Sequence, residues 1–70
     1  MTYLIVLEPT PTGYSAYSPD LDGCVAAGDN RENTIDLMRE AIEFHLEGLA
    51  EAGQPIPAPS SKSVYVEVNA

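Results

Sequence analysis

The residues from Arg31 to Ala52 contain no proline and repeat apolar side chains at helical spacing, which constrains the fold more than any other feature. Asp29 or Asn30 provides a helix N-cap, and Gly53 provides a left-handed stop after the last turn. A helix of this length spans about 33 Å. One amphipathic helix therefore dominates a chain of 70 residues.

Three lines of side chains run along this predicted helix. One is apolar and is expected to face the core: Ile35, Met38, Ile42, His45, Leu46 and Leu49. The second holds carboxylates within a stripe about 100° wide: Glu32, Asp36, Glu40, Glu43, Glu47 and Glu51. The third lies between them and consists of Leu37, Ala41, Phe44 and Gly48.

The third line has two interpretations. Leu37 and Phe44 either wrap onto a loop such as Pro55–Pro59, or they contact another subunit, with Ala41 and Gly48 allowing close approach. A domain this small, without a disulfide, gains little stability from one core. We therefore predict a homo-oligomer, a dimer or higher, with the third line as its contact.

Four further segments have strand composition. Thr2–Leu7 is nearly continuous in apolar residues and is predicted to be a strand buried on both faces. Tyr14–Ser18 and Cys24–Ala27 follow after turn residues, and Ser63–Val68 comes after the helix with its valines alternating inward. The order β-β-β-α-β predicts one α+β domain over residues 1–70. It has two layers, an antiparallel sheet with the helix on one face, and the last strand at an edge or beside the first.

The charge balance excludes some partners. Three Lys and Arg residues face eleven Asp and Glu residues, giving a net charge of −8 and a pI near 4.1. This argues against binding to nucleic acid or to anionic membranes, which need clustered cations. The longest apolar run, Tyr3–Leu7, is far shorter than the roughly 20 residues of a membrane span. With Cys24 as the single cysteine, we expect a cytoplasmic protein.

Few residues suggest catalysis. His45 has no polar partner one helical turn away, and Cys24 has no nearby basic residue to lower its pKa. Asp20 and Asp22, with Asp29, resemble half of a calcium site, but loop capping explains them better. We predict no catalytic residue, no metal site and no cofactor.

The acidic stripe is either a solvated outer face or a surface complementary to a basic partner. The carboxylates that we predict to contact such a partner lie in the loop and on the helix: Asp20, Asp22, Glu40, Glu43 and Glu47.

Several segments together resemble the HicB-like antitoxin family. They are Gly13–Tyr17 (GYSAY), Ser18–Cys24 (SPDLDGC), Ala27–Asp29 (AGD), a helix that opens near Glu32, and Gly53–Pro57 (GQPIP) before a Val-rich segment. The resemblance covers essentially the whole chain. One minor departure is Asn33-Thr34, where the family helix usually begins with alanines.

The resemblance implies a partial ribonuclease H-like fold and a partner, a small basic RNA-cleaving toxin of the HicA type. Many family members carry a second, DNA-binding domain, which we do not expect here because the chain stops after the last predicted strand. The leading hypothesis is a non-enzymatic antitoxin that masks the toxin. The alternative is an orphan oligomeric domain that binds a small ligand or another regulator.

Overall fold

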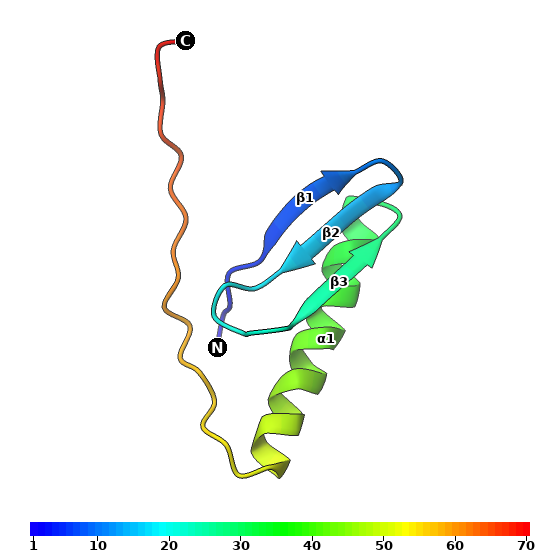
Figure 1. The fold of residues 1–70 in the computed structure, drawn as a ribbon, viewed down its shortest axis with the longest axis vertical. Helices are drawn as coiled ribbons and strands as arrows, with labels where there is room; N and C mark the ends of the chain where they lie inside the picture. Colours follow the sequence, from blue (N-terminus) through cyan, green and yellow to red (C-terminus); the bar gives the residue numbers. More distant parts are fainter.

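The computed structural model describes all residues from 1 to 70 and contains three strands and one helix (Figure 1). The strands are β1 (Val6–Thr10), β2 (Gly13–Tyr17) and β3 (Val25–Gly28), and they are followed by the helix α1 (Arg31–Glu51). The strands form one antiparallel sheet in the order β1-β2-β3. The predicted meander followed by a long helix is confirmed.

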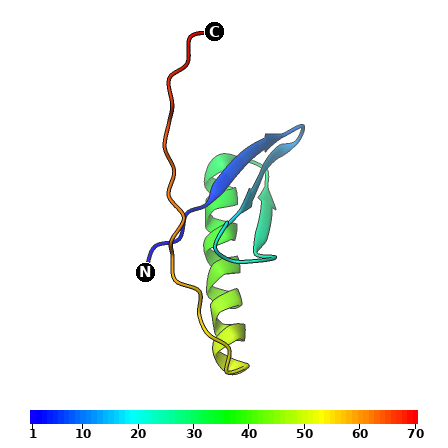
Figure 2. The ribbon, with the colours of Figure 1, turned by 60° about the vertical axis from the view of Figure 1, so that its left-hand side comes forward.

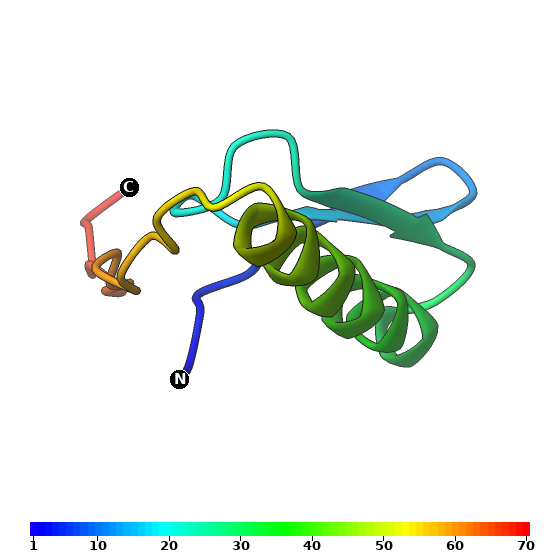
Figure 3. The same cartoon turned by 90° about the horizontal axis from the view of Figure 1, so that it is seen from below.

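The helix covers one face of the sheet, and no element covers the other face (Figure 3). The helix packs mainly against β3 and β2. Little of it therefore lies above β1, which is an edge strand because of the strand order. The predicted α+β class and its two layers are therefore confirmed. The off-centre position of the helix leaves apolar residues near β1 only half-buried.

The first strand begins later than predicted, at Val6 instead of Thr2. The hydroxyl of Ser18 donates a 2.9 Å hydrogen bond to the carbonyl of Leu4, where a backbone ladder would otherwise continue. The predicted burial of this strand on both faces is wrong, because β1 lies at the sheet edge and its last residues are exposed. Pro9 is compatible with such an edge, since its missing N–H group needs no partner strand.

The core is small and sits between β2, the loop after it and the middle of α1. Its buried apolar members are Ala16, Leu21, Cys24 and Met38. Ala16 of β2 and Ala26 of β3 have short side chains at the core, which let the helix approach closely. At Gly28 a Cβ atom would lie 2.7 Å from the Thr34 hydroxyl oxygen, so the end of β3 tolerates no side chain there.

Both helix ends follow local sequence signals. The side chain of Asn30 caps the helix by accepting a 2.8 Å hydrogen bond from the backbone N–H of Asn33. Buried Thr34 donates its hydroxyl to the Asn30 carbonyl at 2.7 Å, so the Asn33-Thr34 pair serves the helix start. Gly53 has a φ of +68°, the left-handed conformation expected for the stop.

The predicted strand Ser63–Val68 is absent from the sheet. After α1 the chain turns back and runs as an extended segment beside the body, on the side of β1 (Figures 1 and 2). Val64, Val66 and Val68 are 74–83% exposed instead of inward. The composition does favour an extended backbone here, but a strand also needs a hydrogen-bonded neighbour, and this segment has none.

Candidate functional site

The outward face of α1 carries carboxylates that no cation of this chain neutralises. The two salt bridges are Arg31–Glu32 at 3.5 Å and Arg39–Asp36 at 3.0 Å, both exposed. Glu40, Glu43 and Glu47 are exposed and have no salt-bridge partner. The helix therefore presents a line of free negative charge to solvent.

An aromatic ring stands beside this line. Phe44 is 72% exposed, and Glu40 and Glu47 lie four residues before it and three after it, so on a helix their side chains flank the ring. The chain beyond the helix does not cover Phe44, because Pro57 is held elsewhere by a hydrogen bond from the Tyr3 hydroxyl to its carbonyl. The wrapped-loop interpretation of Phe44 is therefore wrong.

A shallow hollow of about 250 Å³ continues this surface toward β3. It is lined by Gly23, Cys24, Val25, Ala41, Phe44 and His45. The exposed Asp22 directly precedes Gly23 at its rim. The hollow therefore has an apolar centre beside a charged rim, which is an arrangement typical of protein-binding surfaces. Gly48 faces open space further along the helix.

Asp20 has a role inside the chain that its sequence position did not indicate. Its carboxylate accepts hydrogen bonds from the backbone N–H and the hydroxyl of both Ser60 and Ser61, the shortest being 2.8 Å from the Ser61 hydroxyl. Bonds from the Ser61 N–H and hydroxyl, followed by those from Ser60, lower the pKa of Asp20 below 3.8 and outweigh the opposing effect of desolvation. Asp20 therefore fastens the C-terminal segment to the loop after β2.

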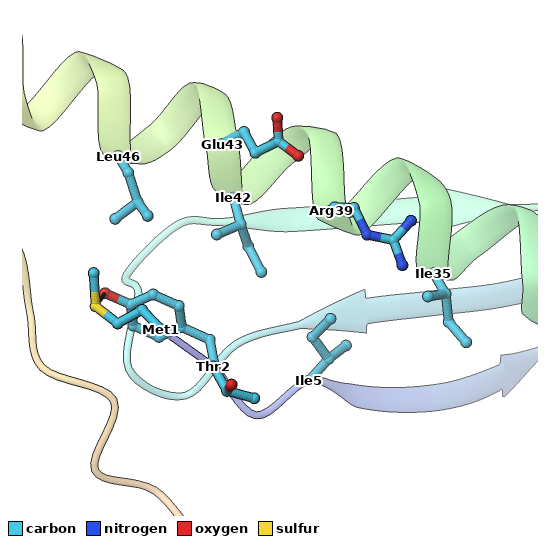
Figure 4. A pocket seen from close by; sticks show the side chains of 9 residues that line it. Met1, Thr2, Ile5, Ile35, Arg39, Ile42, Glu43 and Leu46 are labelled. Atoms are coloured by element: carbon cyan, nitrogen blue, oxygen red, sulfur yellow. Dashed lines mark hydrogen bonds between the residues drawn. The ribbon is translucent and has the colours of Figure 1, made fainter.

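A second hollow, of about 430 Å³, lies between α1 and the segment that precedes β1 (Figure 4). Figure 4 shows Ile35, Ile42 and Leu46 on the helix side of the hollow, and Met1, Thr2 and Ile5 on the segment that faces them. The walls of the hollow are mainly apolar, and Arg39 is the one cationic side chain among them. This hollow is the unfilled space that the off-centre helix leaves near β1.

Cys24 and His45, the two residues considered for catalysis, lie in the core or beside it. Cys24 is 5% exposed, and burial raises the pKa of its thiol, as expected for a small core residue. His45 is half-buried and lines the shallow hollow. No group of three or more His, Cys, Asp or Glu side chains is placed to hold a metal ion.

The sequence matches, over residues 3–69, the family described as HicB_like antitoxin of bacterial toxin-antitoxin system. The chain belongs to the HicB-like antitoxin family. The resemblance seen in the GYSAY and SPDLDGC segments is confirmed by this match. The one helix of this HicB-like chain is not long and apolar enough to cross a bilayer.

Individual proteins of known sequence or structure support the assignment. The chain is 31% identical over 71 residues to antitoxin HicB 2 of Photorhabdus laumondii, covering 100% of this chain and 51% of that protein. It is 35% identical over 66 residues to a 14.9 kDa protein of Haemophilus phage HP1, covering 94% and 50%. It thus spans about half the length of these two relatives.

One solved structure also resembles this HicB-like chain. A chain from a HicA3 and HicB3 toxin-antitoxin complex superposes with a TM-score of 0.74 at 35% identity. The match covers 86% of this chain and 70% of that one. The arrangement of the sheet and helix is therefore shared with a protein that was solved in a toxin-antitoxin complex.

Proposed function

We propose that this HicB-like chain binds and neutralises a small basic, RNA-cleaving toxin of the HicA type. Membership of the antitoxin family and the likeness to a chain from a HicA3 and HicB3 complex support the proposal. The observation that carries it is the outward face of α1, where an exposed aromatic ring stands among carboxylates without partners.

The chemistry of this face suits a basic protein. Phe44 supplies an apolar anchor of the kind that dominates binding energy in protein interfaces. Glu40 and Glu47 beside it would pair with Lys or Arg of the toxin, and Glu43 and Asp22 extend the negative rim. Asp20, in contrast, is already engaged by Ser60 and Ser61, so we assign it an indirect role.

The same surface is a poor contact between two copies of this chain. An isologous contact through Leu37, Ala41, Phe44 and Gly48 would bring the glutamates flanking Phe44 against their own counterparts. Like charges brought together in an interface oppose association. The self-contact on this line stays a prediction, whereas the charges favour a basic partner.

The proposed mechanism is masking without catalysis. A toxin that cleaves RNA needs a basic surface to hold the phosphate backbone. The anionic face of α1 would compete for those cations, and the bound domain would exclude RNA from them. Because the contribution of this chain is contact and charge, no bond of the toxin or of the RNA changes in the neutralised state.

Titration of this chain into a HicA-type toxin tests the proposal, with calorimetry to measure affinity and RNA cleavage to measure neutralisation. We expect Glu40→Lys/Glu47→Lys to weaken binding at least about tenfold, and Phe44→Ala to weaken it similarly. The matched control Asp29→Lys/Glu32→Lys makes the same charge change at the start of α1, about two turns before Glu40, and should leave affinity unchanged. Equal affinity for all variants would contradict the assigned surface. No binding at all would favour the orphan-domain alternative.

A further inference from the structure

The segment Ser63–Val68 has the properties of a strand that lacks its neighbour. Its three valines recur at every second position, and all are exposed. None of the 33 backbone hydrogen bonds involves a residue after Gln54, so the N–H and C=O groups of this segment are free. An extended apolar segment with unpaired backbone groups is a template for pairing with a sheet edge.

The route of the chain limits which edge this segment meets. Asp20 holds Ser60 and Ser61, and the Tyr3 hydroxyl holds the carbonyl of Pro57. These contacts keep the start of the segment on the β1 side of the molecule, where Figures 1 and 2 show it running past β1 and away from β3. The sheet edge within its reach is therefore that of β1.

The outer edge of β1 has no hydrogen-bonded strand beside it, so a further strand can pair there. Ile5 and Leu7 pack toward the core from this strand and its approach, but they are only half-buried. Beside them lies the 430 Å³ hollow that Ile35 and Ile42 line from the helix. A strand hydrogen-bonded to β1 would place alternate side chains over this hollow, and Val64, Val66 and Val68 alternate as required.

We infer that two copies of this chain exchange their Ser63–Val68 segments, each pairing with β1 of the other copy. The area of the single chain supports a dimer. A compact monomer of this mass exposes about 4,200 Å², whereas this chain exposes 5408 Å². The surplus of about 1,200 Å² exceeds the roughly 800 Å² that each partner buries in a standard interface.

The radius of gyration is consistent with this. It is 13.9 Å, compared with about 11 Å for a compact domain of this length.

The single chain also shows why its own edge is not filled. A hollow of about 520 Å³, lined by Leu4–Leu7 and Ser63–Tyr65, separates the segment from β1 of the same chain. The connector Pro55–Pro59, which leads to the segment, is rich in proline and therefore stiff. Stiff connectors favour exchange between copies, because the segment gains its pairing in the partner without bending the connector. Every copy has both a Ser63–Val68 segment and a free β1 edge, so a two-fold dimer pairs both segments with both edges.

Disulfide trapping in the full chain tests the exchange. In the proposed contact Val64 is one of the inward valines and Ile5 directly precedes β1, so Ile5→Cys/Val64→Cys places one thiol on each side of that contact. We expect oxidation to give a covalent species of twice the 7.5 kDa chain mass in high yield. The control Ile5→Cys/Glu67→Cys puts the second thiol on the outward side of the segment, at a position that does not line the hollow of about 520 Å³, and should give at least about tenfold less. A disulfide within one chain, or no preference between the variants, overturns the proposal.

Light scattering with paired variants supplies a second measurement. Val66→Asp puts a charge on the inward face, and we expect it to weaken the dimer about 100-fold or more. Tyr65→Asp adds the same charge to the outward face and should leave the dimer intact. Circular dichroism of the helix checks that Val66→Asp is folded. A monomeric wild type, or a dimer that persists in Val66→Asp, overturns the exchange. The result does not depend on toxin binding.

Discussion

Single glycines decide how closely β3 meets the start of the helix. A methyl group at Gly28 would collide with side-chain oxygens of Asn33 and Thr34, and Thr34 is itself buried and bonded to Asn30. We expect Gly28→Ala to lower the free energy of unfolding by about 1–3 kcal/mol, because neither oxygen can move without breaking a helix-start contact. Urea unfolding followed by circular dichroism measures the change.

Gly48 is the matched control for Gly28. It lies in the helix, and a methyl group added there would have no atom of another element within 4 Å, so Gly48→Ala adds helix propensity without a clash. We expect it to raise the free energy of unfolding by about 1 kcal/mol. Equal stability of Gly28→Ala and wild type would contradict the close packing of β3 on the helix start.

Asp20 makes attachment of the C-terminal segment depend on pH. Hydrogen bonds from Ser61 and Ser60 lower the pKa of its carboxyl below 3.8, so the folded state holds the charged form more strongly than the unfolded state does. The stabilisation is therefore complete above pH 3.8 and is lost as the pH falls through the lower folded pKa.

Amide hydrogen exchange at Ser60 and Ser61 measures this attachment. We expect faster exchange of both amides in Asp20→Ala at neutral pH, and in wild type only at acidic pH after correction for intrinsic rates. Asp22→Ala is the control, because Asp22 makes no hydrogen bond to the segment. Unchanged exchange in Asp20→Ala would contradict the anchoring role.

At the scale of elements, the sequence predicts best what local contacts determine. The helix ends lie within one residue of those predicted, because the cap at Asn30 and the stop at Gly53 are local signals. The hairpin follows from turn residues, but β1 begins just after Leu4, whose carbonyl accepts a hydrogen bond from Ser18, a residue that follows another strand. The prediction of a last strand is wrong for the same reason, because Ser63–Val68 has strand composition but no hydrogen-bonded partner in its own chain.

In the candidate site, too, the sequence predicts what depends on local spacing and misses what depends on contacts between distant residues. Helical spacing alone places Glu40 and Glu47 on the outward face beside Phe44, and the structure keeps them exposed there. The bonding of Asp20 to Ser60 and Ser61 joins residues about forty positions apart, and no local pattern indicates such a contact. Spacing along one helix therefore predicts which side chains share a surface. Contacts between distant segments can be identified only from the folded structure.

For the whole molecule, the two proposed surfaces differ in charge. The face of α1 around Phe44 carries much of the net charge of −8, whereas Ser63–Val68 contains one charged residue, Glu67. A field of this size attracts a basic protein over about a Debye length, which is about 10 Å at 0.1 M salt. Pairing of backbone groups and valines responds little to salt. Ionic strength therefore separates toxin binding from self-association.

A salt series on both reactions gives the last prediction. Between about 0.05 and 0.5 M NaCl we expect the association rate with a basic HicA-type toxin to fall at least tenfold, because screening removes the attraction between the partners. The dimer dissociation constant should not rise over the same range, because salt screens the repulsion between two copies that each carry a net charge of −8 and leaves the apolar burial in place. Stopped-flow fluorescence measures the first quantity and sedimentation equilibrium the second. A dimer that weakens as salt rises, together with salt-insensitive toxin association, would show that the two surfaces have been assigned the wrong way round.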